Sequence, residues 1–431
     1  MLNQELNVKL AGGYELDLPK MYLVKQKFDQ AKLESIPAAV KQEIGKESIK
    51  RTVKKGDSIA VAVGSRGIAN LFEIVRAVVK ELQGLGAVPF VLPAMGSHGG
   101  ATDEGQKQVL ASYGITEESI GAEIKSSMEV IELGTTETGM PVYLDKYASE
   151  ADSIVVINRV KPHTDFKADY ESGLMKMMGI GLGKHKGATK MHSYGFDQFE
   201  RVIPEVGNYV LAHSKIIFGV AILENAYDKT KKIEAIPAGE IASREKELLV
   251  EAKALLPKIL VPEIDVLIVN EIGKDISGSG MDPNITGKVG SGLPGFEAPP
   301  IQKVIVLDLT EKTHGNACGI GMADVTTRRL VEKIDFNYTY ANSITSTVLE
   351  PAKIPVAMNN DKEALVVALR TCNRITIPEA KIVRIHNTLE LGEIMVSEAA
   401  YQLIKDQENI ELIEGPFPLS FDENGFINDN M

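Results

Sequence analysis

Short apolar runs rich in valine and isoleucine recur along the first half of the chain, and each one is followed by a polar loop. The runs cover residues 57–63, 88–92 and 153–157, and apolar residues recur at helical spacing over residues 69–82 and 102–113. Strands buried on both faces of a parallel sheet have such continuous apolar runs, and they alternate with the helices that cover the sheet. The pattern therefore predicts an α/β domain with a mostly parallel sheet.

The same alternation continues after residue 215 and restarts after a break near residue 260. Further strands are expected at residues 216–223, 265–269 and 304–307, and further helices at residues 239–256 and 362–369. The sequence Val261-Pro262-Glu263 interrupts the pattern, which places a domain boundary between residues 255 and 264. We therefore predict two α/β domains with mostly parallel sheets, residues 1–258 and 259–431, with the second closing over an active-site cleft between them. The polar tail after Gly415 is expected to be poorly ordered.

The composition is that of an ordinary globular protein. The 431 residues are 44% hydrophobic and 25% charged, and the net charge of −12 at pH 7 argues against nucleic acid as a partner. The two cysteines, Cys318 and Cys372, are too few for a disulfide framework, so free thiols are expected. No apolar stretch is long enough to span a bilayer, and the first twenty residues lack the apolar centre of a signal peptide. A cytoplasmic location without membrane contact is therefore expected.

Three loops that follow predicted strands contain side chains suited to binding or protonating a ligand. They are Gly64-Ser65-Arg66-Gly67, Gly96-Ser97-His98-Gly99-Gly100 and Lys161-Pro162-His163. The carboxyl ends of parallel strands meet at one edge of a sheet, where α/β proteins bind ligands, so Arg66, His98 and His163 can converge. Arginine binds carboxylate and phosphate groups, and imidazole exchanges protons near neutral pH. From local sequence alone, an exposed loop residue remains the alternative at each position.

A glycine- and lysine-rich segment, residues 171–192, follows the third loop. Four of the seven histidines lie in or near it: His163, His185, His192 and His213. Lys176 stands among leucine and methionine residues, and apolar surroundings lower the pKa of a lysine and make its amine nucleophilic. An exposed lysine remains the alternative, and Lys184 in the same segment is a second candidate for the reactive lysine.

Taken together, these residues resemble the nickel-pincer-nucleotide-dependent lactate racemase family. That family has an arginine in the turn after its first strand, as in Gly64-Ser65-Arg66, and a histidine in a turn before a helix, as in Gly96-Ser97-His98. It has a second histidine after a Glu-Ala-Asp sequence and a strand, and here Glu150-Ala151-Asp152 precedes His163. The resemblance covers most of the first domain and little of the second.

The spacing of a lysine and a histidine is the most specific part of the resemblance. The family has a Ser-Gly-x-x-Lys segment whose lysine holds the cofactor, and Ser172-Gly173-Leu174-Met175-Lys176 matches it. The nickel-binding histidine follows sixteen residues later, and His192 has that spacing from Lys176. The resemblance thus implies a nickel-pincer nucleotide covalently held by Lys176, with His192 on the nickel. Further cofactor contacts are expected from Gly64, Ser65, Gly96, Ser172 and Gly173.

The activity that this resemblance implies is a racemase or epimerase of 2-hydroxy acids. The Cα hydride would move to the cofactor and return to either face of a planar keto acid. His98 and His163 would exchange the hydroxyl proton on opposite sides of the substrate, since each enantiomer requires its own base. Arg66 would hold a carboxylate or neutralise developing charge.

The chain departs from the family at several positions. Three extra residues separate His163 from Lys176, and Met175 stands where the family has arginine. In the second domain the family has an Asn-Ile-Tyr-Gln segment before a substrate-binding lysine. The nearest match, residues 282–288, has Thr286 in place of the tyrosine and a displaced Lys288.

From these differences we expect a substrate other than lactate, larger or more polar, contacted by Arg66 and Lys288. The polar residues His314, Asp324 and Arg328 are further candidates for recognising it. A solvated loop is the alternative for that region.

Two other functions remain open from the sequence. A zinc-dependent hydrolase could use His98, His163 and His192 as ligands, since three histidines and a water make a catalytic zinc site. A non-catalytic protein of the same fold could bind an anion or a nucleotide. The expected partner is a small 2-hydroxy acid, without nucleic acid or membrane, and a homo-oligomer is left open.

Overall fold

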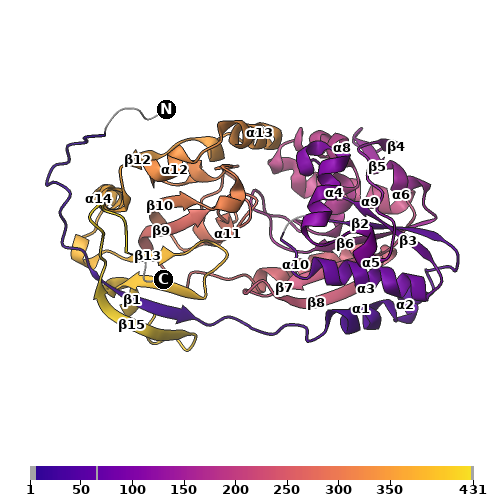
Figure 1. The fold of residues 1–431 in the computed structure, drawn as a ribbon, viewed down its shortest axis with the longest axis horizontal. Helices are drawn as coiled ribbons and strands as arrows, with labels where there is room; N and C mark the ends of the chain where they lie inside the picture. The colour runs from indigo at the N-terminus through magenta and orange to yellow at the C-terminus, as the bar shows by residue number, and fades with distance from the viewer. Residues whose placement is uncertain (1–5, 65–66, 429–431) are drawn as a thin grey trace. The chain divides into compact units, whose positions relative to one another are not determined.

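The computed structural model describes residues 6–64 and 67–428 (Figure 1). Contacts divide the chain into two compact units, each with a mixed α/β fold and a large, mostly parallel sheet, as predicted. We call Gln30–Leu256 the central unit, and Met1–Asp29 with Pro257–Met431 the terminal unit. The observed units differ from the expected domains, 1–258 and 259–431, because the N-terminal segment belongs with the C-terminal part of the chain.

The central unit is built on a five-stranded sheet of order β3-β2-β6-β7-β8, which is parallel except for β8 at one edge. Its strands are β2 (Ser58–Val63), β3 (Val88–Pro93), β6 (Ser153–Arg159), β7 (Ile216–Glu224) and β8 (Thr230–Pro237). The middle of the sheet is buried on both faces, which explains the continuous apolar runs in the sequence. A separate antiparallel pair consists of β4 (Val130–Thr135) and β5 (Pro141–Asp145).

Helices cover both faces of this sheet. One face packs on α1 (Ile36–Ile44) and α3 (Leu71–Gly84), whose apolar residues join the side chains of the strands in one core. On the other face, Leu174 and Ile241 approach Gly219 of β7, so α7 (Leu174–Lys176) and α10 (Ile241–Ala254) lie there. The remaining helices are α2 (Glu47–Lys50), α4 (Asp103–Ser112), α5 (Glu117–Ile120), α6 (Lys146–Glu150), α8 (Lys184–His192) and α9 (Phe199–His213).

The terminal unit is built on an eight-stranded sheet of order β12-β11-β10-β9-β13-β14-β1-β15. The first five strands are parallel and the last three are antiparallel to their neighbours. The strands are β1 (Lys20–Gln26), β9 (Ile264–Ile272), β10 (Ile301–Leu309), β11 (Val325–Thr327), β12 (Val356–Met358), β13 (Ile382–Ile385), β14 (Glu393–Ser397) and β15 (Ile410–Pro418). The helices are α11 (Pro283–Thr286), α12 (Arg328–Glu332), α13 (Phe336–Ser346), α14 (Asp361–Thr371) and α15 (Glu398–Gln402).

The two ends of the chain meet in this sheet. Figure 1 shows the indigo strand β1 beside the yellow strand β15. Met21 and Val24 of β1 have no exposed area. The expectation of a poorly ordered tail after Gly415 is wrong, because β15 extends to Pro418 and Phe421 pairs with Ile427.

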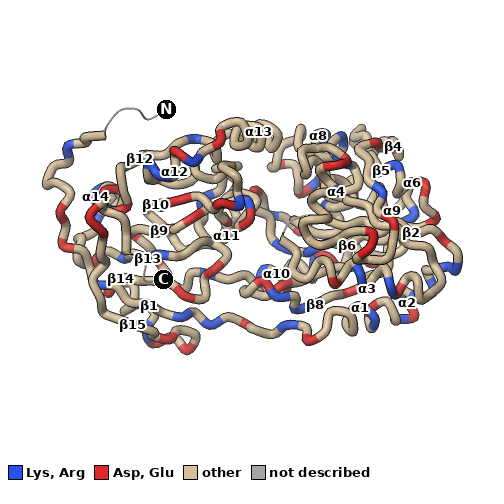
Figure 2. The backbone as a smooth tube through the Cα atoms, in the orientation of Figure 1, with Lys and Arg blue, Asp and Glu red and all other residues tan. Residues whose placement is uncertain are grey.

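All six strands predicted from the sequence are present, with bounds close to those expected. The predicted helices over 69–82, 102–113, 239–256 and 362–369 correspond to α3, α4, α10 and α14. Acidic and basic residues are interspersed along both units (Figure 2). Both cysteines are free, as predicted. Within residues 6–64 and 67–428, no helix has both the length and the apolar character needed to cross a bilayer.

Candidate functional site

The loop after β6 and the start of the glycine- and lysine-rich segment lie side by side. The Lys161 N–H donates to the Ser172 carbonyl at 2.9 Å, and the Ser172 N–H donates back to the Lys161 carbonyl at 3.1 Å. This pairing brings His163, two residues after Lys161, close to Lys176, four residues after Ser172. The two candidate residues therefore meet because their backbones are paired.

His163 and Lys176 are in direct contact, with 2.5 Å between Nε2 of the ring and the amine Nζ. The other ring nitrogen, Nδ1, accepts the backbone N–H of Asp165 at 3.0 Å. The Asp165 carboxylate is 3.7 Å from Nδ1, beyond hydrogen-bonding distance. The backbone of Asp165, and not its carboxylate, therefore orients the His163 ring.

These contacts define the protonation of the pair. Because Nδ1 accepts a hydrogen bond, the neutral ring carries its proton on Nε2, which faces the amine of Lys176. A neutral amine can accept that proton, whereas an ammonium group cannot. Burial lowers the pKa of Lys176 to about 8, and the nearby positive charge of Lys161 acts in the same direction. Burial, and then the charge of Lys176, hold the pKa of His163 well below its usual value.

His192 is the last residue of α8 and belongs to the same cluster. Its ring lies 5.6 Å from that of Phe196 and 5.4 Å from that of Phe199. The His163 ring lies 5.8 Å from Phe196, so one aromatic wall connects the two histidines. Burial and the charge of Lys176 lower the pKa of His192 to about 4, and a hydrogen bond to the backbone of Ala188 acts in the opposite sense. We call His163, Lys176 and His192 the lysine–histidine cluster.

The segment between Lys176 and His192 is helical almost throughout. It consists of α7, a π-helical turn over Met177–Gly181, and α8. Turns of the π type are rare and are frequently found at functional sites. Here the turn separates the candidate lysine from the candidate metal ligand.

The glycines predicted to contact a cofactor lie next to this segment. Asn158, near the end of β6, donates to the Gly173 carbonyl at 2.9 Å. Its Oδ1 would lie 2.6 Å from a Cβ at Gly64, so the turn after β2 is tightly packed beside the Gly173 backbone. Ser65 and Arg66 lie outside the described residues.

The turn with His98 approaches the helical segment through its backbone. The Gly96 N–H lies 3.4 Å from the Gly181 carbonyl, and Gly96 is buried. The His98 side chain is exposed, and Gln106 of α4 donates to the backbone carbonyls of Gly96 and His98 at 2.9 and 3.3 Å. Thr102 caps α4, since its hydroxyl accepts the Gly105 N–H.

Lys184 is held differently from Lys176. It has no exposed area, its Nζ pairs with Asp145 at 3.0 Å, and the amine donates to the Pro93 carbonyl and to Gln106. An ion-paired lysine with three partners is poorly suited to act as a nucleophile. The geometry therefore favours Lys176 over Lys184 as the reactive lysine.

The remaining candidates lie in the terminal unit. Lys288 follows α11, and its Nζ is 4.0 Å from an Asp324 carboxylate oxygen. Asp324 also accepts the Val304 N–H at 2.8 Å, next to the amino end of β11. Arg328 is 3.7 Å from Glu332, and His314 has a left-handed backbone conformation.

A three-histidine zinc site is absent from the part of the chain that the structure describes. No group of three His, Cys, Asp or Glu residues there is arranged to hold a metal ion, although His98, His163 and His192 are all included. The geometry thus gives no support to the zinc hydrolase alternative.

Sequence reasoning missed the residues that support the cluster. Glu171 has no exposed area and accepts the His163 N–H at 2.6 Å, and Glu245 accepts the Met175 N–H at 2.9 Å. Glu171 lies in the segment that the sequence singled out, so an acid beside the lysine was a usable signal. Glu245 lies seventy positions from Met175 in the chain and had no such signal.

Comparisons with known proteins agree with this picture of the central unit. The family described as "Lactate racemase N-terminal domain" matches residues 4–201. A comparison with curated proteins finds no match.

Two solved structures are similar in fold. The lactate racemase apoprotein from Thermoanaerobacterium thermosaccharolyticum has a TM-score of 0.50 and 14% identity, over 85% of this chain and 94% of that chain. A protein of Thermotoga maritima has a TM-score of 0.50 and 12% identity, over 82% of this chain and 96% of that chain. The family resemblance predicted from the sequence is confirmed: the chain carries a lactate racemase N-terminal domain over residues 4–201 and has the lactate racemase fold.

Proposed function

We propose that this protein is a racemase or epimerase of a 2-hydroxy acid that works with a nickel-pincer nucleotide. The observation that carries the proposal is the contact between the Lys176 amine and His163, with His192 on the same aromatic wall, inside a lactate racemase N-terminal domain. In this proposal Lys176 holds the cofactor covalently and His192 binds the nickel. Gly64, Ser65, Gly96, Ser172 and Gly173 contact the cofactor.

The side chains present fit such a group. The Lys176 amine is a nucleophile once deprotonated, and its pKa of about 8 makes a substantial neutral fraction available near neutral pH. His192 is neutral at that pH, as a metal ligand has to be, and its bond to the Ala188 backbone orients the ring. Imidazole nitrogen is a suitable donor for nickel.

The bound cofactor supplies an acceptor for the Cα hydride of the substrate. His163 exchanges the hydroxyl proton with the substrate through its imidazole ring. His98 has the equivalent role on the opposite face of the substrate. Arg66 and Lys288 bind the carboxylate.

Covalent attachment is tested by intact mass and nickel analysis of protein made together with a cofactor-synthesis pathway. The wild-type chain is expected to gain a mononucleotide-sized mass on the peptide containing Lys176, with about one nickel per chain. Lys176→Ala should lose the adduct and His192→Ala should lose the nickel, since each removes the only proposed bond of its kind.

Two exposed residues of α8 serve as matched controls, because Lys186 and His185 belong to the same segment. Lys186→Ala and His185→Ala should keep both adduct and nickel. An adduct that persists in Lys176→Ala would refute the attachment residue, and full nickel in His192→Ala would refute the ligand. A different result would favour a non-catalytic binding protein: the wild-type chain gains no adduct, and Lys176→Ala still binds 2-hydroxy acids.

The hydride route makes a separate prediction about isotopes. A substrate deuterated at Cα should retain part of its deuterium after racemisation in ordinary water, because the hydrogen returns from within the site. Mass spectrometry of the product measures the retention. Complete exchange with solvent would instead indicate removal of the Cα hydrogen as a proton.

A further inference from the structure

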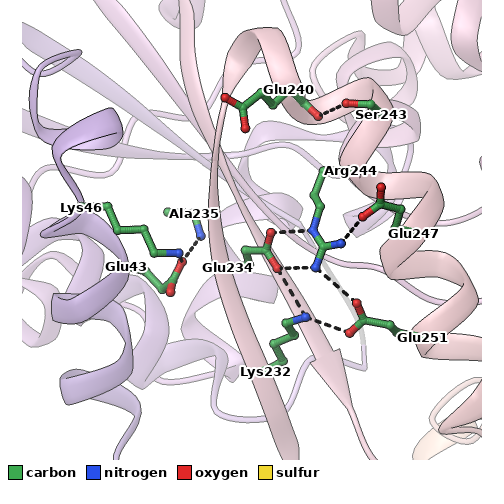
Figure 3. A network of polar contacts seen from close by, with 10 residues as sticks. All are labelled: Glu43, Lys46, Lys232, Glu234, Ala235, Glu240, Ser243, Arg244, Glu247 and Glu251. Atoms are coloured by element: carbon green, nitrogen blue, oxygen red, sulfur yellow. Dashed lines mark hydrogen bonds and ion pairs between the residues drawn. The ribbon is translucent and has the colours of Figure 1, made fainter.

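Helix α10 is fixed to the edge of the central sheet by a network of ion pairs. Figure 3 shows Arg244 of α10 between Glu234 of β8 and two acids of its own helix. The Arg244 Nε lies 2.7 Å from Glu234, and Lys232 of β8 lies 2.8 Å from Glu251. Because several charges act together, this network restrains the helix more than an isolated surface pair would.

The same helix contacts the segment that leads to Lys176. The Tyr170 hydroxyl donates to the Ala242 carbonyl at 2.8 Å, and Lys246 pairs with Asp169 at 2.7 Å. Lys253 pairs at 2.6 Å with Glu171, whose carboxylate accepts the His163 N–H. Residues 169–171 are thus tied to α10, and the loop of His163 is tied to it through Glu171.

Glu245 supplies the contact nearest to Lys176. Its side chain is 1% exposed, and its Oε2 accepts the backbone N–H of Met175, the residue before Lys176, at 2.9 Å. Its Oε1 has no hydrogen-bond partner and would lie 2.4 Å from a Cβ at Gly173. Glycine at position 173 therefore leaves room for the carboxyl group against the backbone.

A buried carboxyl group with an unsatisfied oxygen is costly, and an apolar side chain would avoid that cost. The arrangement has an evident local consequence, since it fixes the backbone one residue before the candidate nucleophile. We propose that Glu245 is a positioning residue: it holds the backbone beside Lys176 so that the amine stays against His163. The functional meaning of Glu245 rests on the proposed role of Lys176. Its effect on the Lys176 amine can be measured without the cofactor.

The test follows the titration of the Lys176 amine in the folded, full-length, cofactor-free chain. Trace acetylation with acetic anhydride between pH 6.5 and 10.5, read by mass spectrometry of peptides, gives a labelling midpoint for each lysine. The wild-type midpoint of Lys176 should lie near pH 8. In Glu245→Ala it should rise by about one unit or more, because the freed amine becomes solvated like an ordinary lysine.

Three variants separate positioning from loss of stability. Glu245→Gln keeps an oxygen for the Met175 N–H, so its midpoint should stay near that of the wild type. Glu247→Gln changes a neighbour on the same helix whose side chain is 65% exposed, and it should have no effect. Gly173→Ala places a methyl group against the Glu245 carboxyl and should raise the midpoint as Glu245→Ala does. Lys184, which has no exposed area in the folded chain, reports general unfolding in the same digests.

The proposal is overturned if a folded Glu245→Ala protein keeps the wild-type midpoint at Lys176. If that variant does not fold, an unchanged midpoint in Gly173→Ala overturns it equally. Failure of the racemase proposal looks different. A wild-type chain without adduct or nickel would refute the cofactor, while the shift of the Lys176 midpoint would still be observed.

Discussion

At the scale of single residues, the cluster depends on polar groups that are buried rather than solvated. Burial favours the neutral forms of Lys176 and His163, and the backbone of Asp165 fixes which ring nitrogen carries the proton. Burial also raises the pKa of the Glu245 carboxyl to about 7. The same physical effect thus favours the uncharged form of a base, Lys176, and of an acid, Glu245, which contacts the residue before that base.

The raised pKa of Glu245 predicts a pH dependence of stability. Between pH 4.5 and 7 the folded state binds more protons at this carboxyl than the unfolded state does, so the free energy of unfolding should fall as the pH rises through that window. The shift corresponds to roughly 3 kcal/mol. Glu245→Gln should remove this contribution and flatten the profile, measured by urea unfolding of the central unit at pH 5 and pH 8. If the free energy of unfolding changed equally with pH in Glu245→Gln and Glu247→Gln, the pH dependence would not come from Glu245.

The reactive residues of this site could be predicted from the sequence more readily than the residues that position them. His163, Lys176 and His192 could be named because their residue types and their spacing are local properties of one stretch of chain. Glu245 could not, since an acid in an amphipathic helix is ordinarily exposed and only the folded chain brings it to Met175. Asn158 is intermediate, because the end of a buried strand is a known place for ligand-binding side chains.

At the scale of elements, the turn with His98 is connected to α8 by buried polar contacts. Gln106 of α4 has no exposed area; its amide donates to the Gly96 and His98 carbonyls, and its oxygen accepts from Lys184 at 3.1 Å. Lys184 itself has a φ of 51°, a strained conformation for a residue with a side chain. Strain of this kind persists only where the surrounding contacts determine the backbone.

Removing the Gln106 amide should therefore loosen the His98 turn. Gln106→Leu leaves two backbone carbonyls and the Lys184 amine without this partner, at a cost of about 1–3 kcal/mol for each buried group left unsatisfied. Hydrogen exchange of the His98 and Ala101 amides, which donate to Met95 and Ser97 carbonyls, should accelerate by roughly tenfold or more. Gln83→Leu, which removes an exposed contact to Gly121, is the control and should not change exchange in this turn.

The strands predicted correctly are those with the strongest burial. β2, β6, β9 and β10 have continuous apolar runs because both their faces are covered. β15 was missed because most of its residues are exposed or partly exposed, and β11 and β12 because three residues are too few for a pattern. β1 was missed because its apolar run, residues 21–24, is short and its partners lie at the other end of the chain.

At the scale of the whole molecule, the first strand stabilises the last part of the chain rather than the part that follows it. Met21 of β1 packs in a core with Ile382 and Met395, more than 350 positions away, whereas Leu82 belongs to the core of the central unit. Met21→Ala should destabilise the terminal unit by roughly 2–5 kcal/mol, as expected for truncation of a buried methionine. Hydrogen exchange should accelerate in β13 and β14 and stay unchanged in β2 and β6. Leu82→Ala, a truncation of similar size, should have the reverse pattern, because its cavity forms in the other core. If either variant accelerated hydrogen exchange in all four strands, the two units would unfold together, contrary to what separate cores predict.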